Sequence, residues 1–303
     1  MSRTVRIIGA PTDYGANRRG VDMGPSAIRY AGLARQLASA GASCNDTGDM
    51  LAPLMEEREN HDRDINARHL DAVREVNSRL GDEVAATLAA GETPLVLGGD
   101  HSVAIGSLAG SARAADIGVI WFDAHGDFNT PETSPSGNVH GMPLAAALGR
   151  GAFADMEWAN AANLKEENVV LVGLRDLDDA EREAIRDSSV TAYTMSDIDA
   201  RGLTAVVDEA LDVAASSVDG IHVSLDLDWL DPHEAPGVGT PVRGGVTYRE
   251  AHAAMELLAE TDGRYGVLRS MELVEVNPIL DERNKTAEMA AELAASALGK
   301  RIL

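Results

Sequence analysis

Acidic and imidazole side chains alternate at one point of the chain, directly after an apolar run. The segment "IGVIWFDAHGDFN", from Ile117 to Asn129, ends in Asp123, His125 and Asp127. In an extended segment every second side chain points to the same side, so these three side chains would face together. Two carboxylates held side by side repel each other unless a cation lies between them. The spacing therefore indicates a metal site, although a loop of solvated acids has the same pattern.

Two further segments repeat this arrangement. "SLDLDWLDP" places Asp226 and Asp228 two positions apart after the apolar run "IHVSL", and "LGGDHS" places His101 after a Gly-Gly turn. Taken singly, the first also fits an acidic strand end, and the second fits a helix capped by Asp100 or Ser102. Each segment follows a predicted strand, and polar groups at the carboxyl ends of parallel strands meet at one edge of a sheet. Together the segments favour one metal-binding edge.

Short runs rich in β-branched residues alternate with helical patterns along the chain. The expected strands begin at Val5, Pro94, Ile117, Asn168, Gly220 and Tyr265, and the helical patterns cover residues 66–90, 203–215, 248–261 and 284–298. This alternation predicts βαβ units, and the nearly continuous apolar runs predict strands covered by helices on both faces. We expect an α/β fold formed by one domain over residues 1–303, with three αβα layers and a mainly parallel central sheet.

The chain is strongly acidic. Its 49 Asp and Glu residues outnumber 26 Lys and Arg residues, for a net charge of -23, and only Lys165, Lys285 and Lys300 are lysines. Such a surface repels phosphates, which excludes nucleic acid as a partner. An acidic, lysine-poor surface resembles that of proteins from salt-accumulating cells, so we hypothesise a halophilic protein. The single cysteine, Cys44, and the lack of a signal peptide or long apolar run predict a cytoplasmic protein without membrane association.

The chemistry of the candidate ligands indicates which metal they bind. The candidates are His101, Asp123, His125, Asp127, Asp226 and Asp228. Two imidazoles and four carboxylates without a thiolate favour Mn²⁺ over structural zinc, and imidazole disfavours Mg²⁺. Six side chains are too many for one ion that must leave a coordination place for substrate, but they suit two ions that share bridging carboxylates. We expect two Mn²⁺ ions per subunit that activate a bridging water for hydrolysis.

Further motifs extend this pattern over most of the chain. From Arg18 to Pro278 they read "RRGVDMGPSAIRY", "GGDHS", "DAHGDFNT", "SGNVHGMP", "GLRDLD", "SLDLDWLDP", "APGVGTPVRGGVTYRE" and "EVNP". With these motifs in this order, the chain resembles the arginase family of ureohydrolases, and among them the bacterial members. The resemblance implies the arginase-like fold and a dinuclear manganese cluster held by the six ligands above. It also implies that a metal-bridging hydroxide attacks the guanidinium carbon of L-arginine, which yields L-ornithine and urea.

The resemblance also implies catalytic roles for three residues and a substrate-binding role for a fourth. Asp127 would hydrogen-bond the hydroxide and help carry its proton. Glu275 of "EVNP" would orient the planar guanidinium, although it could instead form a structural salt bridge. His140 would deliver a proton to the departing amine, which cannot leave as an anion. Thr247 of "GGVTYRE" matches a pocket residue of the family, although it is also placed to cap the following helix.

Five more positions match residues of the family that recognise the amino-acid end of the substrate. Asn129, Ser136 and Asn138 match the groups that contact the α-carboxylate. Asp178 matches the carboxylate that faces the α-amino group, and Asp176 lies nearby in support. Agmatine lacks the α-carboxylate, and agmatinases generally lack the "DFN" and "SGN" combination. The resemblance therefore favours L-arginine as substrate.

Three other functions fit part of the pattern. An amidinohydrolase acting on agmatine or a related guanidino compound would use the same metal cluster. A metal-binding protein without activity would keep the ligands, and a deacetylase of related architecture would use a single zinc. One residue departs from the family pattern: Arg243 stands where relatives carry an aliphatic or small residue. By the same resemblance we expect a homotrimer or a homohexamer.

Overall fold

Eight strands form the centre of the molecule. The computed structural model describes residues 3–53 and 65–301. Its strands are β1 (Thr4–Ala10), β2 (Ser43–Asp49), β3 (Thr93–Gly98), β4 (Ile117–Phe122), β5 (Leu164–Leu174), β6 (Thr191–Thr194), β7 (Gly220–Asp226) and β8 (Leu268–Val274). They pair in the order β2-β1-β3-β8-β7-β4-β5-β6, and every pairing is parallel. The expected α/β class with a parallel central sheet is confirmed.

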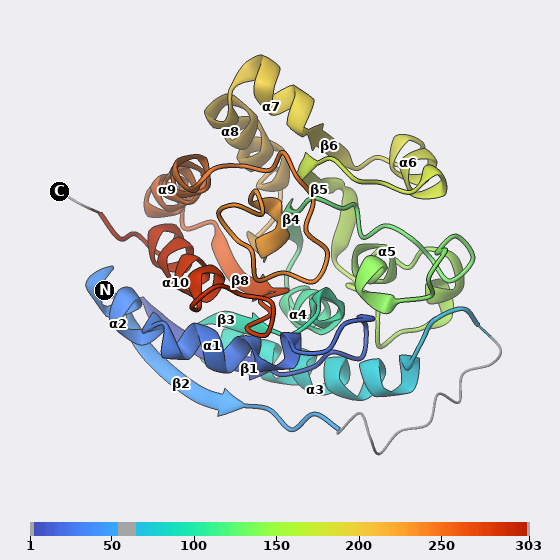
Figure 1. Ribbon diagram of the computed structural model, residues 1–303, viewed down its shortest axis with the longest axis horizontal. Helices are drawn as coiled ribbons and strands as arrows, with labels where there is room; N and C mark the ends of the chain where they lie inside the picture. Colours follow the sequence, from blue (N-terminus) through green and yellow to red (C-terminus); the bar gives the residue numbers. More distant parts are fainter. Residues whose placement is uncertain (1–2, 54–64, 302–303) are drawn as a thin grey trace.

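Helices cover both faces of this sheet (Figure 1). On one face lie α1 (Gly24–Tyr30), α2 (Leu33–Ser39), α7 (Met195–Arg201), α8 (Leu203–Ala214), α9 (Tyr248–Tyr265) and α10 (Lys285–Ala297). On the other lie α3 (Leu70–Ala89), α4 (Ala104–Ser111), α5 (Pro143–Ala147) and α6 (Asp179–Arg186). Short 3-10 helices are η1 (Val21–Met23), η3 (His101–Val103), η4 (Val139–Gly141), η5 (Gly151–Asp155) and η6 (Leu227–Trp229). The three αβα layers follow directly.

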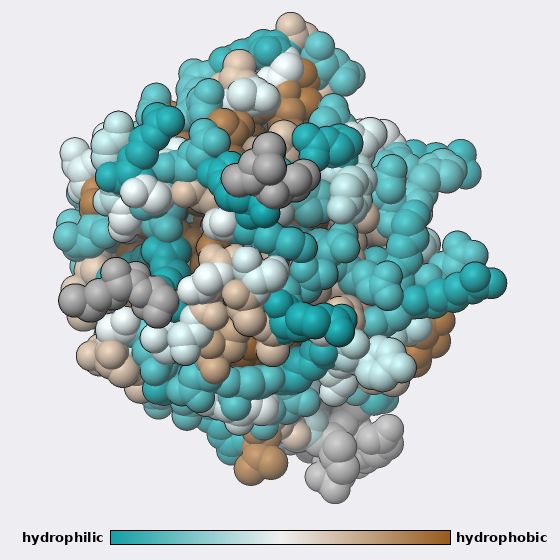
Figure 2. Space-filling view, turned by 90° about the vertical axis from the view of Figure 1, so that its left-hand side faces the viewer, coloured by the Kyte–Doolittle hydropathy of each residue, from teal (hydrophilic) through white to brown (hydrophobic). Residues whose placement is uncertain are grey.

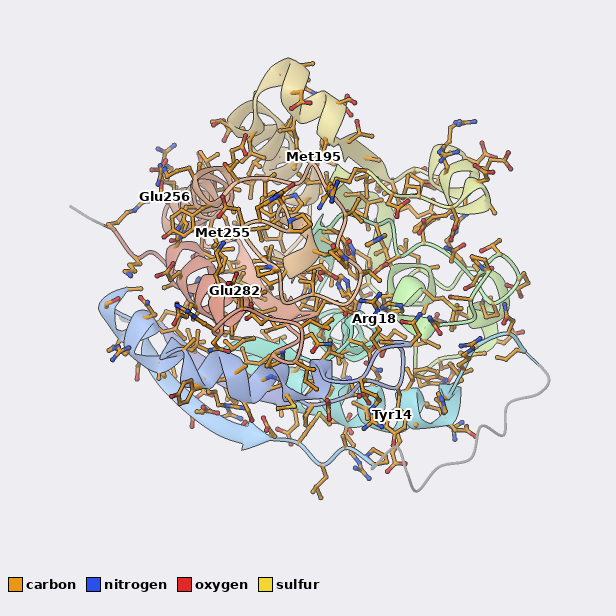
Figure 3. All side chains as sticks on the ribbon, viewed as in Figure 1. Tyr14, Arg18, Met195, Met255, Glu256 and Glu282 are labelled. Carbon is orange, nitrogen blue, oxygen red and sulfur yellow. The ribbon has the colours of Figure 1, made fainter. Side chains whose placement is uncertain are left out.

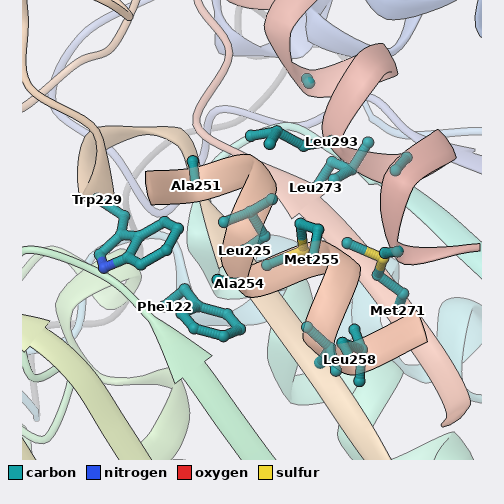
Figure 4. Close-up of a cluster of buried hydrophobic side chains, with 14 of the residues drawn as sticks. Phe122, Leu225, Trp229, Ala251, Ala254, Met255, Leu258, Met271, Leu273 and Leu293 are labelled. Atoms are coloured by element: carbon teal, nitrogen blue, oxygen red, sulfur yellow. The ribbon is translucent and has the colours of Figure 1, made fainter. Parts of the chain in front are cut away.

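Side chains fill the space between the layers (Figure 3), and the buried cluster there consists of apolar residues. Between α9 and the central strands, Met255 and Leu258 of the helix pack with Leu225 and Leu273 of the sheet (Figure 4). β4 is buried along its whole length, because helices cover it on both sides. Burial of this kind is the main stabilising contribution to an α/β fold. Each inner strand ends where its buried apolar run ends, and the polar segments that carry the candidate ligands begin there.

Hydrophilic residues predominate on the face seen in Figure 2, between small apolar patches. Among the exposed large apolar side chains of the described residues, Tyr30, Leu51 and Tyr265 are the most exposed. No helix in the described part of the chain combines the length and the apolar character that a membrane span requires. The surface character agrees with the excess of acidic over basic residues in the sequence.

Candidate metal centre and substrate cleft

The candidate metal ligands meet at the carboxyl edge of the sheet. His101 opens η3 after β3, Asp123 follows β4, and Asp226 and Asp228 lie at the end of β7 and in η6. Because β3, β4 and β7 are parallel members of one sheet, their ends lie on the same side. These four side chains are at most 3% exposed. Buried carboxylates of this density require compensation by protons, hydrogen bonds or cations.

One group of ligands surrounds His101. Its Nδ1 atom lies 3.1 Å from Oδ2 of Asp123, 2.9 Å from Oδ2 of Asp127 and 3.1 Å from Oδ2 of Asp226. Yet His101 Nδ1 and Asp127 Oδ2 have no hydrogen-bond partner among the described residues. A ring nitrogen donates at most one proton, so it cannot satisfy three carboxylate oxygens. A cation coordinated by these atoms would satisfy all of them.

A second group surrounds His125. Its Nδ1 atom lies 3.4 Å from Oδ1 of Asp123 and 3.1 Å from Oδ2 of Asp228. Asp123 thus directs one oxygen toward each imidazole, as a carboxylate that bridges two cations must. The potential ligand atoms of His101, Asp123 and Asp226, and those of Asp123, His125 and Asp228, lie within 4.8 Å of one another in each group. The donor set therefore fits two ions that share Asp123.

The pKa values of the ligands reflect this crowding. Burial, and then repulsion from Asp123, raises the pKa of Asp127 to about 6. Burial and repulsion from Asp228 raise the pKa of Asp226 well above its usual range. Burial alone would lower the pKa of His101, but the facing carboxylate of Asp127 raises it well above its usual value. Protons and metal ions therefore compete for the same atoms, and metal binding would displace protons.

Two residues at this edge adopt a backbone conformation that side chains rarely tolerate. Asp127 has a φ of 49° and Glu275 a φ of 63°, both in the left-handed region. Such strain persists where the surrounding structure holds it, and it concentrates at functional sites. The conformation places both carboxyl groups at the same cleft, which they line together with His140.

The buried Glu275 pairs with the partly exposed His140. Oε1 of Glu275 accepts a hydrogen bond from the backbone N–H of His101 at 2.9 Å and lies 3.1 Å from Nδ1 of His140. Burial would raise the pKa of Glu275, but the hydrogen bond from His140 brings it below its usual value. Burial would lower the pKa of His140, but Glu275 raises it to about 9. Within residues 3–53 and 65–301, Oε2 of Glu275 has no partner, so an ionised oxygen is left for a cationic ligand.

The cleft above this edge has a volume of about 210 Å³. It brings together the sequence-predicted residues His101, His125, Asp127, Asn129, Ser136, Asn138, His140, Asp176, Asp178, Asp226 and Glu275. Asp123 and Asp228 are buried within the two ligand groups described above. The predicted catalytic, metal-binding and substrate-binding residues thus share one place, with Thr247 as the exception.

The position of Thr247 corrects the sequence-based expectation. Thr247 is exposed and is the N-cap of α9. Its hydroxyl accepts a hydrogen bond from the N–H of Glu250 at 3.4 Å, and the Glu250 carboxylate accepts one from the N–H of Thr247 at 2.8 Å. This reciprocal pair is a capping box. Thr240 lines the cleft instead, and its hydroxyl donates to Oδ2 of Asp228 at 3.0 Å. Arg243, between the two threonines, is exposed.

Four further cleft residues were not expected from the sequence: Ser134, Gly141, Thr240 and Glu181. Oε1 of Glu181 accepts the N–H of Phe128 at 2.9 Å, and Oε2 accepts the N–H of Asp178 at 3.3 Å. Burial raises the pKa of Glu181 to about 8. The sequence does contain a signal for this residue, because Asp178 and Glu181 have the spacing of a capping box at the start of α6.

Two loops meet at the rim of the cleft. Nδ2 of Asn129 donates to Oδ2 of Asp178 at 3.0 Å, and this contact joins the loop after β4 to the loop after β5. The backbone N–H of Asn138 donates to the hydroxyl of Ser136 at 3.1 Å. Asp176 and Asp178 are exposed. The rim therefore presents amide and hydroxyl groups beside exposed carboxylates, which suits a ligand that carries both a negative and a positive charge.

The parallel sheet with two candidate ligand groups at its carboxyl edge has the architecture of a metal-dependent α/β protein. The model described as the Arginase family matches residues 3–299. The chain is 51% identical to the arginase of Bacillus subtilis and 50% identical to that of Brevibacillus brevis, with 100% of each chain covered in both cases. The native structure of Bacillus caldovelox arginase matches with a TM-score of 0.92 at 50% identity, covering 99% of this chain and 100% of that one. The chain therefore belongs to the arginase family.

Proposed function

We propose that the protein hydrolyses the guanidinium group of L-arginine to L-ornithine and urea, with two Mn²⁺ ions bound per subunit. The ions would be held by His101, Asp123, His125, Asp127, Asp226 and Asp228. The observation that carries the proposal is the position of Asp123, whose two oxygens face two different imidazoles. A donor set without thiolate and with four carboxylates favours Mn²⁺. Membership of the arginase family supports the reaction class.

The bound ions would supply Lewis-acid chemistry and lower the pKa of water, so that hydroxide is available near neutral pH. Asp127 takes up the proton through its Oδ2 atom, which is buried at the cleft and has no hydrogen-bond partner among the described residues. Glu275 accepts hydrogen bonds from the guanidinium through its Oε2 atom. Glu275 thus holds the guanidinium, with its carbon, at the same edge of the sheet at which Asp127 accepts the proton.

The departing amine needs a proton. His140 supplies it, because the pKa of about 9 keeps this imidazole protonated at neutral pH. Its contact with Glu275 at 3.1 Å keeps the ring beside the carboxylate that orients the guanidinium. General acid catalysis by a positioned imidazole typically accelerates such a step by about 10²- to 10⁴-fold.

The rim of the cleft selects the amino-acid end of the substrate. Asn129, Ser136 and Asn138 bind the α-carboxylate through amide and hydroxyl donors. Asp178, with Asp176 beside it, binds the α-ammonium. Agmatine would leave the carboxylate-binding groups without a partner. Unpaired polar groups in a recognition site discriminate strongly against the ligand that lacks the partner.

We further propose that residues 1–303 act as one domain in a homotrimer or homohexamer in the cytoplasm of a salt-accumulating cell. The net charge of -23 supports the salt adaptation, since high ionic strength screens repulsion between acidic side chains. The lone Cys44, which has no cysteine to pair with, suits a reducing compartment. Light scattering of the purified protein in concentrated KCl measures the oligomer size, and a monomer would contradict this proposal.

The test of the proposed reaction is urea release from L-arginine and agmatine side by side, after preincubation with Mn²⁺ in molar KCl. We expect urea from arginine and little from agmatine. Faster release from agmatine would overturn the substrate assignment and leave the metal assignment intact. No urea from either compound, with Mn²⁺ shown to be bound, would overturn the proposed reaction.

A further inference from the structure

One arginine lies beside the candidate metal ligands at the carboxyl edge of the sheet. Arg175 follows β5 and is half-buried. Every hydrogen bond that its side chain makes within the described residues goes to a backbone carbonyl rather than to a carboxylate. At distances from 2.5 to 3.3 Å, the guanidinium donates to the carbonyls of Gly173, Asp228, Trp229, Leu230 and Val242. A planar fork with five N–H donors is the only side chain that can serve so many acceptors at once.

Three of these acceptors belong to the segment that carries Asp228, a member of one of the two ligand groups. Asp228 is a member of the group around His125, and Trp229 and Leu230 follow it in the chain. The backbone N–H of Arg175 itself donates to the carbonyl of Ala124 at 2.9 Å, between Asp123 and His125. Arg175 therefore links the end of β4 to the end of β7. Within the described residues, no hydrogen bond of the Arg175 side chain reaches His101 or Asp226, the two ligands that belong to the other group alone.

The loop that carries Thr240 also rests on this arginine. Val242 accepts from Nη2 of Arg175 at 2.9 Å, and Thr240 donates to Oδ2 of Asp228 at 3.0 Å. A Cβ atom on Gly245 would lie 2.6 Å from Nη2 of Arg175 and 2.5 Å from the carbonyl carbon of Leu230. The close approach therefore requires glycine at this position. The loop is held against both the guanidinium and the strand end.

The positive charge of Arg175 also interacts with the candidate ligands Asp228 and Asp123. Burial lowers the pKa of Arg175, and the carboxylates of Asp228 and Asp123 oppose this change. A guanidinium stays protonated in either case. It therefore contributes a fixed positive charge behind the ligands without occupying a carboxylate oxygen that a metal needs.

We propose that Arg175 is a positioning residue for one metal site, the site formed by Asp123, His125 and Asp228. Its fork fixes the backbone of Asp228 and the loop that brings the Thr240 hydroxyl to the Asp228 carboxylate. This inference rests on the proposed function, because it assumes that two ions bind. Partners that orient metal ligands typically change metal affinity by about 10- to 100-fold when they are lost.

The experiment compares Mn²⁺ release from the loaded protein and from the loaded variants Arg175→Met and Arg175→Lys. Each loaded protein is diluted stepwise, and the electron paramagnetic resonance signal of the free aquated Mn²⁺ gives the affinity of each ion. Arg269→Met is the matched control, because Arg269 is a half-buried arginine that donates to the carbonyl of Ser111 at 2.9 Å near the start of β8. Thermal unfolding of each variant is recorded in parallel.

We expect the wild-type protein and Arg269→Met to hold both ions. In both Arg175 variants one ion should bind about 10- to 100-fold more weakly while the other keeps its affinity. Lysine should not rescue the loss, because it keeps the charge but lacks the planar fork. Thr240→Val, which leaves Arg175 in place, should weaken the same ion.

Several results would overturn the inference. If Arg175→Met bound both Mn²⁺ ions with wild-type affinity, the guanidinium would not position Asp228. Full rescue by lysine would assign the effect to charge, and equal weakening of both ions would show a general loss of structure. A wild-type protein that holds fewer than two ions would instead overturn the proposed dinuclear site, and with it this inference.

Discussion

Substitution of Asp178 tests how the cleft recognises the amino-acid end of its substrate. Asp178 lies on the rim, is exposed, and accepts a hydrogen bond from Asn129 at 3.0 Å through Oδ2. It is also the N-cap of α6. Asp178→Asn retains a capping oxygen and the size of the side chain but removes the charge. The variant therefore separates recognition of an ammonium from support of the helix.

The size of the effect follows from the position of Asp178. A hydrogen bond to a charged group contributes about 1.5–3 kcal/mol, and the exposed rim places Asp178 at the lower end of that range. A loss of about 1.4 kcal/mol corresponds to a tenfold lower kcat/KM. We expect about a tenfold loss with L-arginine. With δ-guanidinovalerate, which is arginine without its α-amino group, the variant and the wild-type protein should be alike.

The assay is urea release from both compounds by the Mn²⁺-loaded protein. Asp179→Asn is the matched control, because the Asp179 side chain is 97% exposed and pairs with Arg182. Asp179→Asn should leave kcat/KM unchanged with both substrates. Equal losses with both substrates in Asp178→Asn would show that Asp178 acts through the loop or the helix cap, and would refute its role in binding the α-ammonium.

Three further predictions follow from charge and burial. Asp127→Asn should lower kcat by at least about 10²-fold with an unchanged circular dichroism spectrum, whereas the exposed Asp155→Asn should be neutral; near-normal turnover would refute a catalytic Asp127. The melting temperature should rise with KCl concentration, because salt screens a net charge of -23; equal stability in dilute buffer would argue against salt adaptation. Burial raises the pKa of Glu181 from 4.5 to about 8. Between these two pH values the folded chain keeps a proton on Glu181 that the unfolded chain releases, so the free energy of unfolding falls as pH rises. The slope should be about 1.4 kcal/mol per pH unit in urea unfolding and flatter in Glu181→Gln, and an unchanged slope in that variant would contradict the assignment.

The inner strands and the long helices could be predicted from the sequence because burial imposes the pattern. β4 and β7 are buried along their whole length, and their apolar runs mark them directly. β2 was not predicted, because it is an edge strand with a polar sequence and mostly exposed side chains. β6 is the other edge strand and has only four residues. Edge strands carry a weak signal, since one side lacks a partner.

The candidate site was predictable where spacing alone places a group. The pattern of Asp123, His125 and Asp127 correctly marked the end of a buried strand, but the segment bends after β4 and Asp127 is left-handed, so strand alternation does not set where these side chains point. Thr247 and Thr240 show the limit of such reasoning, because loop conformation decides which threonine reaches the cleft. The spacing of Thr247 and Glu250 matched a capping box and favoured the structural role that Thr247 has. Arg175 was equally hidden, since its carbonyl partners have no signature in the sequence.

The chain itself holds the candidate ligands in place. Oδ1 of Asp123 accepts the backbone N–H of His125 at 2.7 Å, Oδ1 of Asp226 accepts that of Asp228 at 2.8 Å, and Oδ1 of Asp228 accepts that of Ala124 at 3.2 Å. None of these contacts needs a cation. Removal of Mn²⁺ by a chelator should therefore leave the far-ultraviolet circular dichroism unchanged.

The melting temperature should still fall on chelation, because an ion present at about 100 times its Kd stabilises the folded state by about 2.7 kcal/mol. For a chain of 303 residues that corresponds to a shift of about 4 °C, reversed when Mn²⁺ is added back. Zn²⁺-free buffers are needed so that no other cation replaces the one removed. Loss of helical signal on chelation would show that the metal builds the edge, and that the backbone N–H groups do not suffice to hold the carboxylates against their mutual repulsion.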